Sequence, residues 1–201
     1  MMTHTAWYIT RATGYVAWGL LTVTVVLGLV FSARLGRGKV TPAWLLDLHR
    51  FVGGASVIFT GLHVGGLIVD NYVHFNVIDV LVPFASEWRP GAVALGVIAM
   101  YLLAAVEISS LAMKRLPRTW WRKIHMSSHA LFWVATFHLL TAGTDADSPV
   151  SQVVTALVIS LVVFLTLVRV LSDGRLTQRS SPRTNIEAHT VDRERVGPTA
   201  E

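Results

Sequence analysis

The stretch LHRFVGGASVIFTGLHVGG, residues 48 to 66, places two histidines, His49 and His63, inside a segment that is otherwise mostly apolar. A helix of about 20 apolar residues is long enough to cross the hydrocarbon layer of a membrane, which is about 30 Å thick. Ionisable residues are costly in that layer, and they mark functional positions by default. The two histidines are therefore expected to have a partner that offsets their burial.

Comparable apolar stretches recur along the 201 residues, of which 53% are hydrophobic and 14% charged. They cover approximately residues 13 to 33, 48 to 69, 91 to 111, 121 to 142 and 150 to 171. Backbone groups in lipid must be satisfied internally, and the alternating pattern of a membrane β-barrel is absent. We therefore expect an all-α integral membrane protein, with a bundle of five transmembrane helices over residues 1–172 and no second folded domain.

Three other segments complete the expected architecture. The run from 13 to 33 has no internal charge or histidine, which suits a scaffold helix that faces lipid on one side. Residues 71–90, NYVHFNVIDVLVPFASEWRP, are amphipathic and contain two prolines, which predicts an outer loop with a short helix in the membrane interface. Residues 173–201 have too little apolar surface to fold alone, and we expect a disordered cytoplasmic tail.

The net charge of +5 is distributed unevenly. Basic residues surround the first and third connections and the end of the last helix: Arg34, Arg37, Lys39, Arg50, Lys114, Arg115, Arg118, Arg122, Lys123 and Arg169. The second and fourth connections hold Asp70, Asp79, Glu87, Asp145 and Asp147, with Arg89 as their one basic residue. The positive-inside rule then predicts an inner-membrane protein with its N-terminus outside and its C-terminus in the cytoplasm. The basic pI reflects this topology, and we expect no nucleic-acid partner.

Cysteine is absent, which excludes disulfides, iron–sulfur clusters, thiolate zinc sites and covalently attached c-type haem. Any metal or cofactor must be held by histidine, carboxylate or carbonyl groups. Four of the eight histidines fall inside the predicted spans as two pairs, His49 with His63 and His125 with His138.

The two spans that carry these histidines are separated by one crossing, so they run parallel. At 1.5 Å per residue, the intervals of fourteen and thirteen residues correspond to about 21 Å and about 19.5 Å. His49 is therefore expected at the depth of His125, and His63 at the depth of His138. Two imidazoles at one depth can occupy both axial positions of a haem iron, an arrangement that favours electron transfer over oxygen binding.

The interval of thirteen residues raises a geometric difficulty. At about 100° per residue, His63 returns to within about 40° of His49, whereas His138 lies about 140° from His125. Either the first turn of the helix over residues 121–142 is tighter than an α-helix, or the two haems lie at different angles around it.

Residues beside the histidines allow two interpretations each. Arg50, Arg122 and Lys123 are candidates to bind haem propionates, but basic residues are expected at cytoplasmic helix ends in any case. Five glycines in the same span either leave room for a flat macrocycle or allow close helix packing: Gly53, Gly54, Gly61, Gly65 and Gly66. Glu107 is a candidate proton partner or an interhelical hydrogen-bonding group. His129 is expected to be a packing residue or a neighbour of a ligand.

The histidine spacing resembles that of the ferric reductase-like transmembrane domain family over about residues 13–171. The similar features are H-x13-H, H-x12-H two spans later, W-x-x-x-H from Trp121, and H-x4-GTD from His138. That family includes the membrane cores of NADPH oxidases and metalloreductases and the haem-binding subunit of the bacterial methionine sulfoxide reductase system. It also tolerates the interval of thirteen residues.

The resemblance implies two b-type haems, one held by His49 with His125 and one by His63 with His138, which move electrons to the outer side. The oxidases and metalloreductases continue into a flavin and nicotinamide domain, which this sequence lacks. We therefore expect the donor to be a separate flavoprotein or a membrane quinol, and the acceptor to be a periplasmic redox protein, a ferric chelate, a quinone or oxygen.

Three alternatives remain open from the sequence. A quinol-oxidising cytochrome of the b561 type would also bind haem, with a pairing of histidines that could differ. A histidine-lined transporter for divalent metal ions or protons would contain no haem. A passive assembly subunit would need none of the four histidines.

Overall fold

The computed structural model describes residues 3–32, 43–69 and 75–179, and these residues form helices and no β-strand. The helices are α1 (Thr3–Ser32), α2 (Ala43–Val69), α3 (Val77–Leu81), α4 (Pro90–Leu111), α5 (Arg118–Met126), α6 (Ser128–Ala142) and α7 (Pro149–Arg179). Four helical segments are long and apolar enough to cross a membrane: Trp7–Ser32, Ala43–Val69, Pro90–Leu111 and Pro149–Ser172. The predicted class, an all-α multi-pass membrane protein, is confirmed for this part of the chain.

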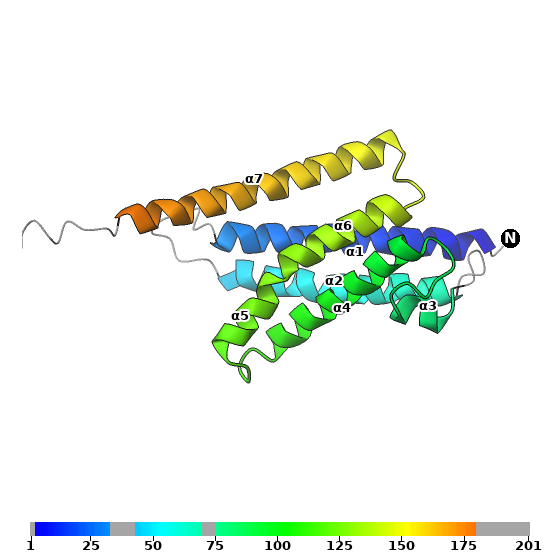
Figure 1. Cartoon of the computed structure of the whole chain (residues 1–201), viewed down its shortest axis with the longest axis horizontal. Helices are drawn as coiled ribbons and strands as arrows, with labels where there is room; N and C mark the ends of the chain where they lie inside the picture. The colour runs from blue at the N-terminus through cyan, green and yellow to red at the C-terminus, as the bar shows by residue number, and fades with distance from the viewer. Residues whose placement is uncertain (1–2, 33–42, 70–74, 180–201) are drawn as a thin grey trace, which may run out of the picture.

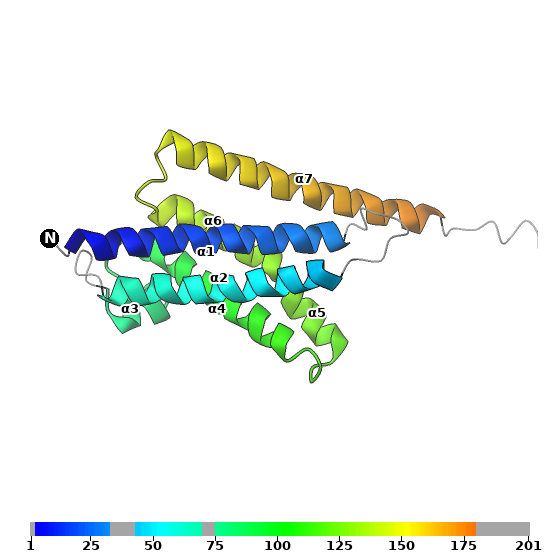
Figure 2. The same cartoon turned by 180° about the vertical axis from the view of Figure 1, so that it is seen from behind.

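The helices run back and forth along the length of the molecule, with α4, α5 and α6 inclined to α1 and α2 (Figure 1). The helix α1 leads away from the labelled N-terminus, α2 returns beside it, and α4, then α5 with α6, then α7 continue the alternation. The helix α1 contacts α2, α6 and α7, while α4 packs against α6, α5 and α2. The helix α7 lies outermost (Figure 2), has its close backbone contacts with α1, and adds Val162 and Leu165 to the core.

The fourth predicted span, residues 121–142, consists of two helices, so the expected count of five membrane-spanning helices is not confirmed. The longer of the two, α6, has 15 residues, or about 22 Å of helix, which is less than the thickness of the hydrocarbon layer. The break falls at Ser127, whose N–H donates to the Ile124 carbonyl three residues earlier (3.0 Å). The Ser127 hydroxyl donates to the same carbonyl (2.6 Å), a competing bond of the kind that bends helices.

The short helix predicted in the outer loop is present as α3. It begins with a capping box, in which Asn76 Oδ1 accepts from the N–H of Ile78 (2.8 Å) and of Asp79 (3.1 Å). The Asp79 carboxylate accepts in return from the N–H of Asn76 (2.9 Å). These bonds satisfy the first free N–H groups of the helix and explain why a helix of five residues forms here.

The main apolar core lies at mid-height of the bundle. It consists of Leu21, Val25, Leu29, Ala99, Leu103, Leu131, Phe132, Val162 and Leu165. A buried polar contact joins α1 to α6, because Trp18 Nε1 donates to Thr136 Oγ1 (3.1 Å). Many large apolar side chains are exposed on the outside, for example Phe51 (74%) and Leu157 (65%). Such a surface is the one that lipid surrounds.

The last helix is longer than its apolar span. The backbone of α7 remains helical to Arg179, beyond the predicted end of the bundle at residue 172. The rest of the predicted tail, residues 180–201, lies outside the described residues.

Candidate functional site

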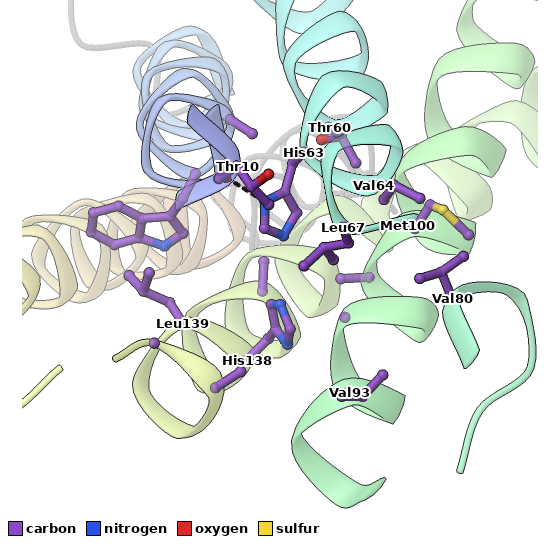
Figure 3. Close-up of a pocket in the computed structure, with 18 of the residues that line it drawn as sticks. Thr10, Thr60, His63, Val64, Leu67, Val80, Val93, Met100, His138 and Leu139 are labelled. Atoms are coloured by element: carbon purple, nitrogen blue, oxygen red, sulfur yellow. Dashed lines mark hydrogen bonds between the residues drawn. The ribbon is translucent and has the colours of Figure 1, made fainter. Parts of the chain in front are cut away.

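The structure brings together, as two pairs, the four histidines that the sequence predicts inside membrane spans. The His49 ring of α2 and the His125 ring of α5 have centroids 6.2 Å apart and planes inclined by 61°. His63 of α2 and His138 of α6 line one cavity, into which both rings project (Figure 3). We call these the inner pair and the outer pair, respectively, after the membrane sides on which the predicted topology places them. The pairing is the one expected from equal depths on parallel helices.

Both rings of the outer pair are fixed by backbone carbonyls. His63 Nδ1 donates to the Thr10 carbonyl (2.8 Å), and His138 Nδ1 donates to the Ala92 carbonyl (2.8 Å). A carbonyl can only accept, so the hydrogen of each neutral ring is on Nδ1, and Nε2 keeps its lone pair. Metal-ligating histidines commonly have this arrangement, in which the second nitrogen holds the ring in orientation.

A glycine stands four residues after each of these two carbonyls. A Cβ atom at Gly14 would lie 2.9 Å from His63 Nδ1, and one at Gly96 would lie 2.6 Å from His138 Cε1. In an α-helix the carbonyl of residue i accepts from the N–H of residue i+4, so the side chain at i+4 lies close to that carbonyl. Glycine at that position lets an imidazole from a neighbouring helix reach the carbonyl.

His49 of the inner pair also lies beside a glycine and the carbonyl four residues before it, but at a larger distance. A Cβ atom at Gly28 would lie 3.6 Å from His49 Cε1, and the carbonyl of Thr24, four residues earlier, lies close to the ring. The buried Nδ1 of His49 nevertheless has no hydrogen bond of normal geometry within the described part of the chain. Gly14 and Gly28 are fourteen residues apart, as are the two histidines of α2, because α1 and α2 pack antiparallel in one register.

The second ring of the inner pair is held by a different set of contacts. His125 stacks on Trp121 with ring centroids 5.1 Å apart and planes 20° apart. The Ser110 hydroxyl of α4 lies 3.4 Å from His125 Nδ1. The Phe31 ring packs edge-on against His49, 5.8 Å away. Aromatic rings thus enclose the inner pair.

The break at Ser127 lies between His125 and His138 and bears on their interval of thirteen residues. The bond from Ser127 to Ile124 spans three residues instead of four, so the chain turns through a larger angle per residue there. One of the two solutions expected from the sequence was such a tightening in the first turn of the span, whereas the break lies at Ser127, between α5 and α6. His125 of α5 and His138 of α6 each lie near a histidine of α2.

The cavity of the outer pair lies among α1, α2, α4 and α6. Its volume is about 190 Å³, counted as the space in which the centre of a water molecule fits. The inner end is formed by apolar side chains such as Leu21, Leu103 and Leu131. The outer end includes Arg11 and Thr144. The walls therefore suit a largely apolar ligand with a polar edge.

The three basic residues proposed for propionates are exposed at the opposite end of the bundle. Arg50 pairs with Asp47 (3.6 Å), and Lys123 Nζ lies 5.7 Å from the centre of the Trp120 ring. Neither these contacts nor the exposed position of Arg122 tests a role in propionate binding, which stays a prediction.

The five glycines of α2 are not among the residues that line the cavity of the outer pair, and their role in making room for a macrocycle stays a prediction. Cβ atoms at Gly53 and Gly54 would meet the Glu107 carboxylate at 3.5 and 4.0 Å, and Gly66 faces the Thr10 side chain. Gly61 and Gly65 face open space. Gly53 and Gly54 make room for Glu107 between α4 and α2, one turn beyond His49.

Of the other four histidines, the structure describes only the side chain of His129. His129, one turn after His125, lies near Arg169 of α7, which fits its expected place as a packing residue. His74 and His189 lie outside the described residues.

Sequence reasoning missed the backbone partners of the outer pair, namely Thr10 and Gly14 on α1 and Ala92 and Gly96 on α4. One signal was present in the sequence. The interval between Gly14 and Gly28 equals that between His49 and His63, which is the pattern that two antiparallel helices in register produce.

Within the described ranges, no group of three or more His, Cys, Asp or Glu residues is placed to hold a metal ion. A porphyrin supplies four nitrogen ligands of its own, so a haem iron needs only two histidines from the protein. No family model, curated protein or solved structure matches the chain. The resemblance to the ferric reductase-like family therefore rests on the histidine pattern alone.

Proposed function

We propose that the protein is a transmembrane electron carrier that binds two b-type haems, one at the outer pair and one at the inner pair. The observation that carries this proposal is the geometry of His63 and His138. Each ring donates its Nδ1–H to a backbone carbonyl across a glycine, and each projects into the same cavity. Rings fixed in this way are prepared to bind a metal through Nε2.

The surroundings of the outer pair fit a porphyrin. The cavity walls are mostly apolar, as the macrocycle requires, and they come from four helices. Because Gly14 and Gly96 have no side chain, the two imidazoles lie directly against the helix backbones of α1 and α4. This placement leaves the space between the rings to a ligand.

The distance between the two rings of the inner pair fits two imidazoles that bind one metal ion. Two imidazoles bound to opposite sides of one metal ion, with metal–nitrogen bonds of about 2 Å, have ring centroids roughly 6 Å apart. The centroids of His49 and His125 are 6.2 Å apart. The Thr24 carbonyl lies close to the His49 ring, and the buried Nδ1 of that ring has no hydrogen bond in the described part of the chain.

When bound, each haem supplies one-electron chemistry between ferric and ferrous iron. The residues of this chain contribute three things. The two histidines of each pair would hold the haem iron and would leave it no open site for a substrate. The backbone carbonyls orient them, and the apolar core that includes Leu131 and Phe132 fills the space between the two pairs and excludes water.

We further propose that α5 and α6 together make a fifth crossing of the inner membrane. They follow one another in the same direction beside α4 (Figure 1), and their combined length supports a full crossing. The exposed basic residues of α5 then lie at the cytoplasmic face and the N-terminus lies outside. The donor is a separate flavoprotein or a membrane quinol, and the acceptor lies on the outer side.

The four single variants His49→Ala, His63→Ala, His125→Ala and His138→Ala test the proposal. Purified protein should show a reducible b-type haem spectrum. His63→Ala and His138→Ala should lose one and the same haem signal, and the other two variants should lose the other signal.

Each rival has a distinct outcome in the same experiment. A different pairing of lost signals would favour a b561-type arrangement. Colourless protein with bound zinc would favour a metal transporter. Unchanged function after replacement of all four histidines would favour an assembly subunit.

A further inference from the structure

Among the described residues, the one charged side chain in the lining of the outer-pair cavity belongs to Arg11, near the outer end. Leucine and alanine side chains form the inner end of the cavity, whereas Arg11, Tyr15 and Thr144 lie among its lining residues toward the outside. Arg11 follows Thr10, whose carbonyl holds His63, so it lies beside the ligand position.

Arg11 is held at the rim by two contacts. Its guanidinium group forms an ion pair with Asp145, which belongs to the connection between α6 and α7. It also lies 5.9 Å from the centre of the Tyr8 ring. The Arg11 side chain is only 24% exposed, and a largely buried cation needs an anionic partner.

We propose that Arg11 binds a propionate carboxylate of the haem held between His63 and His138, in competition with Asp145. This inference rests on the proposed function. Haem b has an apolar macrocycle with two carboxylates on one edge. The apolar inner end of the cavity would leave those carboxylates without partners, so the carboxylate edge points outward, to Arg11.

The competition with Asp145 follows from the charges. One guanidinium group faces the Asp145 carboxylate in the structure, and the haem would bring two more carboxylates to the same rim. Removal of Asp145 would leave the guanidinium group free for the ligand. The arginine fork suits carboxylates because it donates two parallel hydrogen bonds.

The test compares two probes, hemin and hemin dimethyl ester, in which both carboxylates are blocked. Full-length protein with His49→Ala retains the outer pair as its haem site, and each probe is titrated into haem-free protein in detergent. The preference for hemin over the diester should fall about tenfold or more in Arg11→Gln, the loss expected for one charge-assisted hydrogen bond. Asp145→Asn should widen the preference.

Arg89→Gln is the matched control. Arg89 is also at the outer end, but it donates to the Thr141 carbonyl (2.8 Å) and does not line the cavity. This control should keep the preference of the parent protein. If Arg11→Gln weakened both probes equally, Arg11 would be only a structural residue, and the proposal would be overturned. If the parent protein bound neither probe, the haem function itself would fail, a result visible before any Arg11 variant is compared.

Discussion

Gly96 is a position where even one added carbon atom would collide with the His138 ring. In Gly96→Ala the added Cβ would lie 2.6 Å from Cε1 of His138 and 2.9 Å from both ring nitrogens. Carbon atoms in contact are most favourably about 3.5 Å apart or more, so the ring must move by roughly 0.9 Å. That movement stretches or breaks the bond of 2.8 Å between His138 Nδ1 and the Ala92 carbonyl.

The expected consequence is a weaker outer haem site in a folded protein. Loss of the hydrogen-bond partner of a metal-ligating histidine typically lowers metal affinity about 10- to 100-fold. The helix itself should tolerate the change, because alanine is favoured over glycine in a helix by up to about 1 kcal/mol. The inner pair does not touch Gly96 and should keep its haem.

The assay is a hemin titration of haem-free protein, followed by the spectrum of each site. Gly91→Ala is the matched control on α4, because a Cβ atom there would meet nothing within 4 Å. The reasoning would be refuted if Gly96→Ala bound the outer haem as tightly as Gly91→Ala. It would also be refuted if Gly96→Ala weakened both haem sites equally, since that result would indicate a general loss of structure.

Three further substitutions test other contacts. Gly14→Ala should weaken the outer haem about 10- to 100-fold by the same mechanism, while Gly19→Ala on the same helix, where a Cβ meets nothing within 4 Å, should leave hemin affinity unchanged; equal effects would contradict the prediction. Ser110→Ala removes a hydrogen-bond acceptor beside His125 of the inner pair. Loss of this acceptor makes the His125 imidazole less electron-rich, so the reduction potential of the inner haem should rise by roughly 20 mV in a redox titration. A fall in that potential would count against the contact. Trp18→Phe removes the buried bond to Thr136 and should lower the free energy of unfolding by about 1 kcal/mol in a detergent titration, and an unchanged value would show that this bond contributes nothing.

The sequence predicted the histidine pairs well because depth in a membrane is fixed by simple helix arithmetic. Each residue adds the same rise, so equal offsets on parallel helices give equal depths. The short helix of the outer loop was also predictable, because prolines and amphipathic composition mark it. These features depend on local sequence and on depth along the helix axis.

The contacts that hold the outer histidines depend on neighbouring helices and were not predicted. The first span looked like a scaffold helix that faces lipid, yet α1 supplies the Thr10 carbonyl and Gly14. The register between α1 and α2 brings the Thr10 carbonyl and Gly14 to His63. The sequence of one apolar helix does not reveal its register against a neighbouring helix. The break at Ser127 was hidden for a similar reason, because apolar composition continues through α6 while the hydrogen bonds change locally.

The most direct test of the central claim is electron transfer across a sealed vesicle. Protein loaded with haem is inserted into liposomes that contain trapped ferricyanide, and dithionite is added outside. The ferricyanide absorbance should fall in vesicles with the parent protein and stay constant with His63→Ala. Trapped ferricyanide that remained oxidised beside the parent protein would contradict the claim that the two histidine pairs carry electrons across the membrane.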